Sequence, residues 1–186
     1  MSLVAAFSGH RIDEPGRSQP RFPQTAVEKV AEEIRNIISD WNILFGFSSA
    51  AGGADLLFLE QLIARGGEPT IYLPFPTDSF VATSVGPEWK SRFEKVVSNP
   101  KCRIIVLHDK MPEKEDEQKQ AYQECNEAIR EAALAAARIY DQEPLLVAVL
   151  ASSEAGSLTG GTAEAVRIWK ERGCGQVIVT DPLNLQ

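Results

Sequence analysis

Two glycine-rich turns carry the residue types in this sequence that could bind a phosphate group. One turn spans residues 48–55 and reads Ser-Ser-Ala-Ala-Gly-Gly-Ala-Asp; the other spans residues 157–164 and reads Ser-Leu-Thr-Gly-Gly-Thr-Ala-Glu. Each turn follows an apolar run and precedes a helical pattern, so unpaired backbone N–H groups and the positive end of a helix dipole meet there. We therefore expect the two turns to hold a phosphorylated small molecule.

A third polar segment, residues 8–11, directly follows the first apolar run and reads Ser-Gly-His-Arg. Arg11 can present a planar guanidinium to a phosphate, and Gly9 lets the backbone turn beneath it. Arg17 and Arg21 follow closely in an otherwise acidic chain. An arginine in a long loop is also often a solvated side chain. His10 has three open interpretations: a base, a hydrogen-bonding group or a structural histidine.

The candidate ligand-binding residues come from all three segments, because glycine lets a backbone approach phosphate oxygens and hydroxyl groups add donors. They are Ser8, Gly9, His10, Arg11, Ser48, Ser49, Gly52, Gly53, Asp55, Gly160, Gly161 and Thr162. The alternative is purely structural: the glycines allow tight turns and close packing, while a threonine caps the following helix. The sequence leaves both interpretations open.

Asp55 and Glu164 are the candidate catalytic residues if the protein is an enzyme. Each stands at the start of a predicted helix, where an acidic residue is also favoured by the helix dipole alone. The sequence has no Ser/His/Asp order, no metal-ligand cluster, no Walker lysine and no G-x-G-x-x-G after the first strand. An ATPase or dinucleotide dehydrogenase is therefore poorly supported, and we expect neither a metal nor a cofactor.

Apolar runs and amphipathic stretches alternate along the chain. The predicted strands are Leu3–Phe7, Ile43–Phe47, Thr70–Phe75, Cys102–Leu107, Leu145–Leu150 and Gln176–Val179; the predicted helices are Ala26–Trp41, Ala54–Ala64, one beginning near Pro87, Gln120–Tyr140 and Ala163–Arg172. Lys110–Lys119 is predicted to be a solvated loop. This alternation predicts a single doubly wound, Rossmann-like α/β domain over residues 1–186, with a mainly parallel sheet of about six strands and helices on both faces.

Composition limits the partners and the compartment. The net charge of −7 and the pI near 5.0 argue against general nucleic-acid binding, which needs a basic surface. Three widely spaced cysteines, Cys102, Cys125 and Cys174, suggest neither a disulfide framework nor a zinc site. No signal peptide or membrane-spanning run is evident. We expect a cytoplasmic protein with no membrane partner.

The order of these motifs resembles the SLOG superfamily of Rossmann-like domains. Residues 46–55 (Gly-Phe-Ser-Ser-Ala-Ala-Gly-Gly-Ala-Asp), followed by a helix and by Thr70–Pro74, are similar to the DprA branch. The Gly160–Glu164 turn resembles the glycine-rich loop of the "lonely guy" phosphoribohydrolases, the other branch. In those enzymes the catalytic glutamate stands three residues after the threonine, where this chain has Ala165; Glu164 is one residue early, a shift of about 100° on a helix.

The resemblance implies a domain that binds a nucleotide or nucleotide-derived ligand such as a nucleotide sugar, often as a sensor in bacterial signalling or defence. It also implies, as the alternative, N-glycosidic cleavage or transfer on nucleoside monophosphates. A third interpretation is an interaction module with a vestigial pocket, attached to effector domains or proteins. Related folds commonly pair through helices, so a homodimer is expected by analogy.

Overall fold

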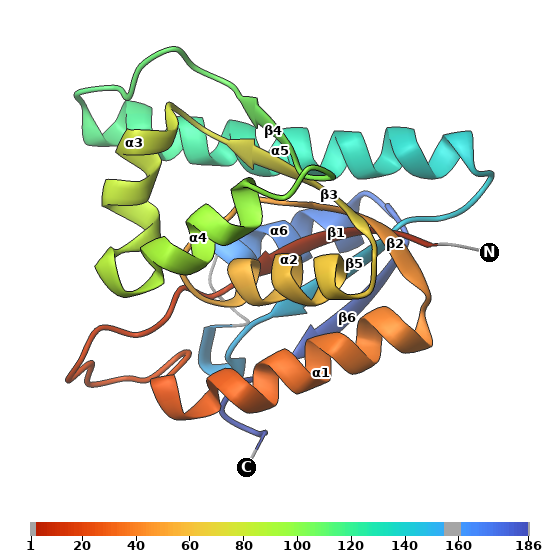
Figure 1. Ribbon diagram of the computed structural model, residues 1–186, viewed down its shortest axis with the longest axis horizontal. Coiled ribbons are helices and arrows are strands. Elements are labelled where there is room, and N and C mark those ends of the chain that lie inside the picture. Colours follow the sequence, from red (N-terminus) through yellow and green to blue (C-terminus); the bar gives the residue numbers. More distant parts are fainter. Residues whose placement is uncertain (1–2, 155–160, 186) are drawn as a thin grey trace.

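The computed structural model describes residues 3–154 and 161–185, and these form an all-parallel sheet covered by helices on both faces (Figure 1). The strands pair in the order β4-β3-β2-β1-β5-β6. Their bounds are β1 (Leu3–Gly9), β2 (Ile43–Ser48), β3 (Glu68–Leu73), β4 (Arg103–Val106), β5 (Leu145–Val149) and β6 (Gln176–Thr180). The predicted single Rossmann-like α/β domain with a six-stranded parallel sheet is confirmed.

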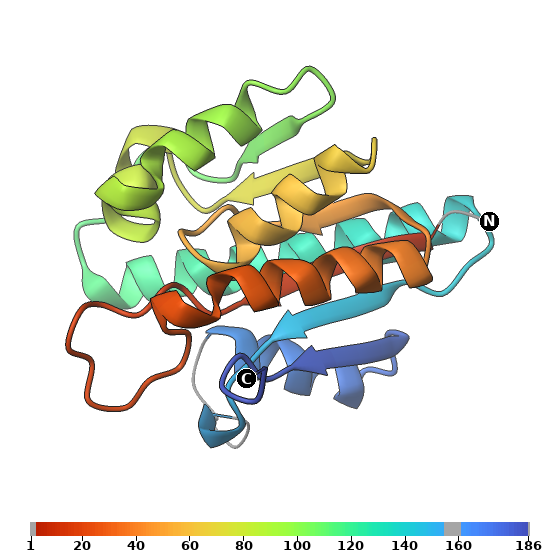
Figure 2. The same cartoon turned by 60° about the horizontal axis from the view of Figure 1, so that its bottom comes forward.

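The helices divide between the two faces of the sheet. Their bounds are α1 (Val27–Asp40), α2 (Ala54–Ala64), α3 (Thr77–Phe80), α4 (Lys90–Val97), α5 (Glu115–Ile139) and α6 (Gly161–Glu171). Helices α1, α2 and α4 lie over one face, and α5 and α6 over the other (Figures 1 and 2). Short 3-10 turns occur at Gln24–Ala26, Pro87–Trp89 and Ser152–Glu154, and a π-helical turn at Val81–Val85.

The alternation of side chains along β1 joins the sheet to both helical layers. Ala5 and Phe7 belong to the core cluster under α1 and α2, whereas Val4 and Ala6 belong to the cluster under α5 and α6. All four side chains are essentially inaccessible to solvent. A parallel strand covered on both faces must be apolar on both, which explains why this segment reads as a continuous apolar run.

The structure differs from the sequence-based expectation in two segments. Helix α5 begins at Glu115, so the second half of the predicted loop Lys110–Lys119 is helical. Its first turn is acidic, which is favourable at the positive end of a helix dipole. Because this turn has no apolar stripe, the sequence pattern did not indicate a helix there. Residues 77–85, to which the sequence analysis assigned no helix or strand, form α3 and the π-helical turn, because Phe80 and Val85 anchor them in the core.

The strand order creates a topological switch point at the centre of the sheet. The chain runs outward from β1 through β2 and β3 to β4, and then returns to place β5 on the other side of β1. Loops that leave β1 and β5 therefore diverge to opposite faces of the sheet. The crevice at the carboxyl ends of these two strands is where doubly wound sheets bind ligands.

Candidate functional site

The carboxylate of Asp55 joins the carboxyl ends of β1 and β2 to the start of α2. Its Oδ1 accepts a hydrogen bond from the Gly9 N–H at 3.1 Å. Its Oδ2 accepts one from the Ser49 hydroxyl and a longer one, 3.4 Å, from the Ala51 N–H. The side chain is buried, and this burial raises the pKa of Asp55 from 3.8 to about 6 against the opposing effect of the three donors.

The Gly52–Gly53 turn is packed against neighbouring backbone. The Gly52 N–H donates to the Ser84 carbonyl at 2.9 Å, and the Gly52 carbonyl accepts from the Ile12 N–H at 3.0 Å. A Cβ on Gly52 would lie 2.0 Å from the Val85 carbonyl oxygen, and one on Gly53 would lie 2.6 Å from the Ile12 nitrogen. Close packing therefore accounts for both glycines. Their phosphate-binding role stays a prediction, and neither lines the pocket described below.

Gly9, Ser48 and Arg11 also lie at this edge of the sheet. A Cβ on Gly9 would lie 2.4 Å from the Ala54 Cβ, so glycine lets β1 end directly against α2. Ser48 is fully buried and donates its hydroxyl to the Phe7 carbonyl at 3.4 Å. Arg11 forms an isolated bridge with Gly53 through its backbone and is exposed. No ion pair holds its guanidinium within the described residues.

His10 is buried between the ends of β1 and β5. Its N–H donates to the Val149 carbonyl at 3.0 Å, and the side chain is 7% exposed. No described atom forms a hydrogen bond with its Nε2. Burial first, then the positive charges of Arg21 and Arg17, lower the pKa of His10 from 6.5 to about 4, opposed by Glu154 and Asp13. The ring is therefore neutral in the folded protein at neutral pH.

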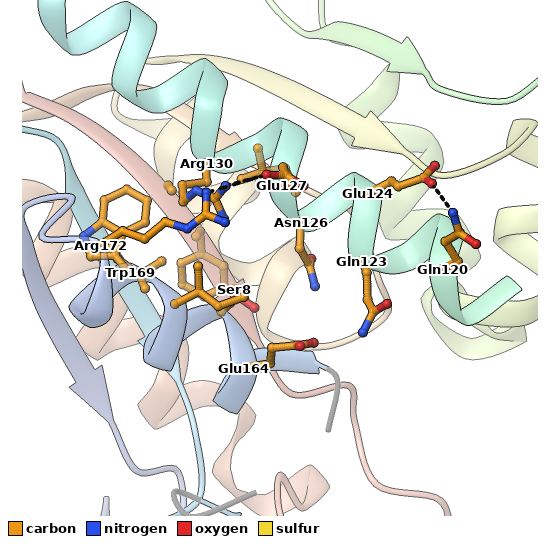
Figure 3. Close-up of a pocket in the computed structure, with 16 residues that line it drawn as sticks. Ser8, Gln120, Gln123, Glu124, Asn126, Glu127, Arg130, Glu164, Trp169 and Arg172 are labelled. Atoms are coloured by element: carbon orange, nitrogen blue, oxygen red, sulfur yellow. Dashed lines mark hydrogen bonds and ion pairs between the residues drawn. The ribbon is translucent and has the colours of Figure 1, made fainter. Parts of the chain in front are cut away.

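A pocket of about 270 Å³ opens between α5 and α6, over β1 and β5 (Figure 3). Of the predicted site residues, Ser8 and Glu164 line it. The side chains of Gln123 and Asn126 point from α5 towards Glu164 on α6 (Figure 3). Apolar side chains complete the wall, among them Ile129, Leu146, Ile168 and Trp169. The pocket lies beside the switch point and combines a flat apolar wall with amide and carboxylate groups.

Glu127 ties the two helices together at one end of the pocket. Its Oε1 accepts a hydrogen bond from Arg130 at 2.8 Å within α5 and lies 3.7 Å from the Arg172 guanidinium. Glu131 accepts a further bond from Arg130 at 3.1 Å. The Arg130 side chain is 8% exposed, yet its Nε has no hydrogen-bond partner among the described residues. Arg130 therefore lines the pocket as a nearly buried cation that the carboxylates of Glu127 and Glu131 hold in place.

The first turn of α6 lies against the carboxyl end of β1. The Ser8 hydroxyl donates to the Thr162 hydroxyl at 3.2 Å, which joins the end of β1 to the start of this helix. Gly161 has a left-handed φ of +67°, and no described atom would lie within 4 Å of its Cβ. Unlike the glycines at 52 and 53, it is not packed against the described part of the chain. Gly160 lies outside the described residues.

Glu164, one turn further along, has a side chain that is 16% exposed. Its carboxylate lies 3.9 Å from Arg167, a long pairing that leaves its oxygens available to the pocket. The one-residue offset seen in the sequence therefore does not turn this side chain away from the pocket. Asp55, by contrast, has both oxygens engaged by donors and does not line this pocket.

The candidate site predicted from the sequence included no residue of the α5 wall of the pocket. Arg130 carried a usable signal: it is the only basic residue between Lys119 and Arg138, and it stands beside the apolar stripe of an alanine-rich helix. A charged residue at such a position must be paired or functional. Trp169 gave no comparable signal, because core packing explains an aromatic residue on an amphipathic helix.

No known family model matches this chain, and no curated protein matches its sequence. The class of the protein therefore follows from the fold and the pocket alone: an α/β Rossmann-like domain with a pocket beside its switch point. Within residues 3–154 and 161–185, no helix is long and apolar enough to cross a membrane. The same residues contain no group of three histidine, cysteine or acidic side chains placed to hold a metal ion.

Proposed function

We propose that this protein is a binding domain for a nucleotide or nucleotide-derived ligand, which it holds between α5 and α6. The observation that carries the proposal is the pocket beside the switch point, bounded by Ser8 of β1 and by the first turn of α6. A helix start offers backbone N–H groups and a positive dipole to a phosphate. The pocket behind it would receive the sugar and the base.

The side chains of the pocket suit the non-phosphate part of such a ligand. Trp169 and Ile168 provide apolar surface for a ring, whereas Asn126 and Gln123 each offer both a donor and an acceptor to a base edge. Glu164 is placed to accept hydrogen bonds from ribose hydroxyl groups. Carboxylates outnumber guanidinium groups in the wall, which favours a single phosphate over a polyphosphate.

Filling the pocket tests this proposal without removing an interaction that holds the fold. Ala165 lines the pocket, so Ala165→Leu is expected to weaken ligand binding by about tenfold or more, equivalent to about 1.4 kcal/mol. Ala135→Leu, on an exposed position of α5 away from the pocket, is the matched control and should bind as the wild type does. Calorimetric titration with nucleoside monophosphates, ADP-ribose and cyclic nucleotides provides the measurement. Failure of every nucleotide to bind folded protein would refute the proposal.

The position of Glu164 supports hydrolysis of an N-glycosidic bond as a second candidate function. In that reaction water attacks the anomeric carbon, the bond from this carbon to the base nitrogen breaks, and the base leaves with a proton. A carboxylate in the pocket would stabilise the positively charged centre, accept the proton of the water and pass it to the departing base nitrogen. Chromatography of nucleoside monophosphates after incubation tests this. Release of free base that is lost in Glu164→Gln, with binding retained, would establish hydrolysis; unchanged nucleotide would leave binding alone.

A further inference from the structure

Strand β4 presents an open hydrogen-bonding edge at one side of the sheet (Figure 2). The Leu107 N–H donates to the Leu73 carbonyl at 2.9 Å, which continues the parallel ladder between β4 and β3. Backbone groups alternate in direction along a strand, so residues 103, 105 and 107 direct theirs towards β3. The N–H and C=O groups of Ile104 and Val106 therefore point away from β3, outward from the edge of the sheet.

The side chains on this edge are apolar and accessible. Ile104 is 38% exposed and Val106 is 43% exposed, and both stand on the sheet face of their register partners Ile71 and Leu73. Natural edge strands are usually protected by lysine, proline, a bulge or a covering element. Strand β4 contains none of these residues, and its one charged side chain is Arg103. Such an edge favours pairing with another strand.

We propose that a second copy of this chain pairs with β4 in antiparallel orientation, with Ile105 on the two-fold axis. In this register Ile104 of each copy lies opposite Val106 of the other, and both residues direct their backbone groups towards the partner. Each such pair exchanges both N–H···O=C bonds. A two-fold axis at Ile104 or at Val106 would pair that residue with its own symmetry mate and place the other one opposite a residue outside β4. With the axis at Ile105, both residues form hydrogen bonds with the partner strand.

The chain turns at Lys101 and bends at Asp109, so the register is carried by residues 103–107. On the opposite sheet face, Ile105 meets its own symmetry mate. The edge is thus self-complementary in hydrogen bonds and apolar side chains.

Sedimentation velocity over a range of concentrations tests the dimer. Wild-type protein is expected to dimerise, whereas the double variant I104K/V106K, which sets lysine opposite lysine, should weaken the dimer on the order of a hundredfold or more. Val179→Lys is the matched control, since Val179 is 44% exposed on the other edge strand, β6. It should leave the dimer unchanged. A monomeric wild type, or a dimer lost only in Val179→Lys, would overturn the proposal.

Mixing complementary variants separates a lost interface from a misfolded chain. The I104K/V106K and I104E/V106E proteins are each expected to be monomeric, and their mixture should form a heterodimer because lysine then faces glutamate. Native mass spectrometry distinguishes the heterodimer by mass. Two variants that are folded by circular dichroism but remain monomeric when mixed would rule out pairing through β4.

A cysteine at the symmetry axis tests the register. Facing residues of a non-hydrogen-bonded antiparallel pair have Cα atoms about 4.5 Å apart, which lies within disulfide range. In a Cys102→Ser background, I105C should therefore cross-link into a covalent dimer on mild oxidation, whereas I104C should do so far less. Equal cross-linking of the two variants would exclude the proposed register.

Discussion

Asp55→Asn is expected to lose roughly 2 kcal/mol of stability, relative to wild type, when the pH is lowered from 6.5 to 4. The reason is the raised pKa of the buried carboxyl, about 6 in the folded protein compared with 3.8 ordinarily. Between these values the folded state binds a proton that the unfolded state does not. The wild type therefore gains stability from this group as the pH falls, and a side chain that cannot titrate gains none.

His10 acts in the opposite direction over nearly the same range. Its pKa is lowered from 6.5 to about 4, so below pH 6.5 the unfolded state binds a proton that the folded state excludes. This group removes stability as the pH falls, by an amount similar to what Asp55 adds. Relative to wild type, His10→Asn should accordingly gain roughly 2 to 3 kcal/mol between pH 6.5 and 4.

Urea unfolding of the wild type, both single variants and the double variant at several pH values measures these effects. Differences from the wild type remove the background from the many surface carboxylates, which are common to all four proteins. The double variant should follow the wild-type pH profile, because the two opposing contributions disappear together. If the difference between Asp55→Asn and wild type is constant from pH 4 to 6.5, the carboxyl is not the titrating group that its burial indicates.

The fold could be predicted because its signals are local. Apolar runs of strand length, separated by amphipathic stretches, specify a parallel sheet with covered faces, and β5, buried at every position, is the clearest example. Helix α5 was predicted to begin too late because its first turn is acidic and has no apolar stripe. The π-helical turn at Val81–Val85 was missed for a different reason: it depends on tertiary contacts and has no sequence periodicity.

The site was less predictable, because a glycine-rich turn has the same sequence signature whether it binds a ligand or packs against backbone. Gly52 and Gly161 looked equivalent in the sequence. In the structure a side chain on Gly52 would collide with Val85, whereas a Cβ on Gly161 would have no described atom within 4 Å. The other wall of the pocket comes from α5, and the distance in sequence between Ser8 and Arg130 concealed their common position.

Gly52→Ala is expected to destabilise the protein by about 3 kcal/mol. The added methyl group would lie 2.0 Å from the Val85 carbonyl oxygen, 2.9 Å from the carbonyl carbon and 3.2 Å from the Trp89 Cβ. The carbonyl belongs to backbone held by the π-helical turn and by the bond from the Gly52 N–H to Ser84 O, so no flexible side chain can move aside. Chemical denaturation measures the loss.

Gly66→Ala is the appropriate control, because it separates steric collision from backbone strain. Gly66 has a left-handed φ of +84°, and no described atom would contact its Cβ, so alanine there should cost only about 1 kcal/mol. The comparison also tests the two interpretations of the Gly52–Gly53 turn, close packing and ligand binding. If Gly52 packs, as its contacts indicate, Gly52→Ala should lose stability while protein kept folded at low temperature still binds nucleotide. A Gly52→Ala variant that keeps its stability but loses nucleotide binding would instead show that Gly52 contributes to the ligand site.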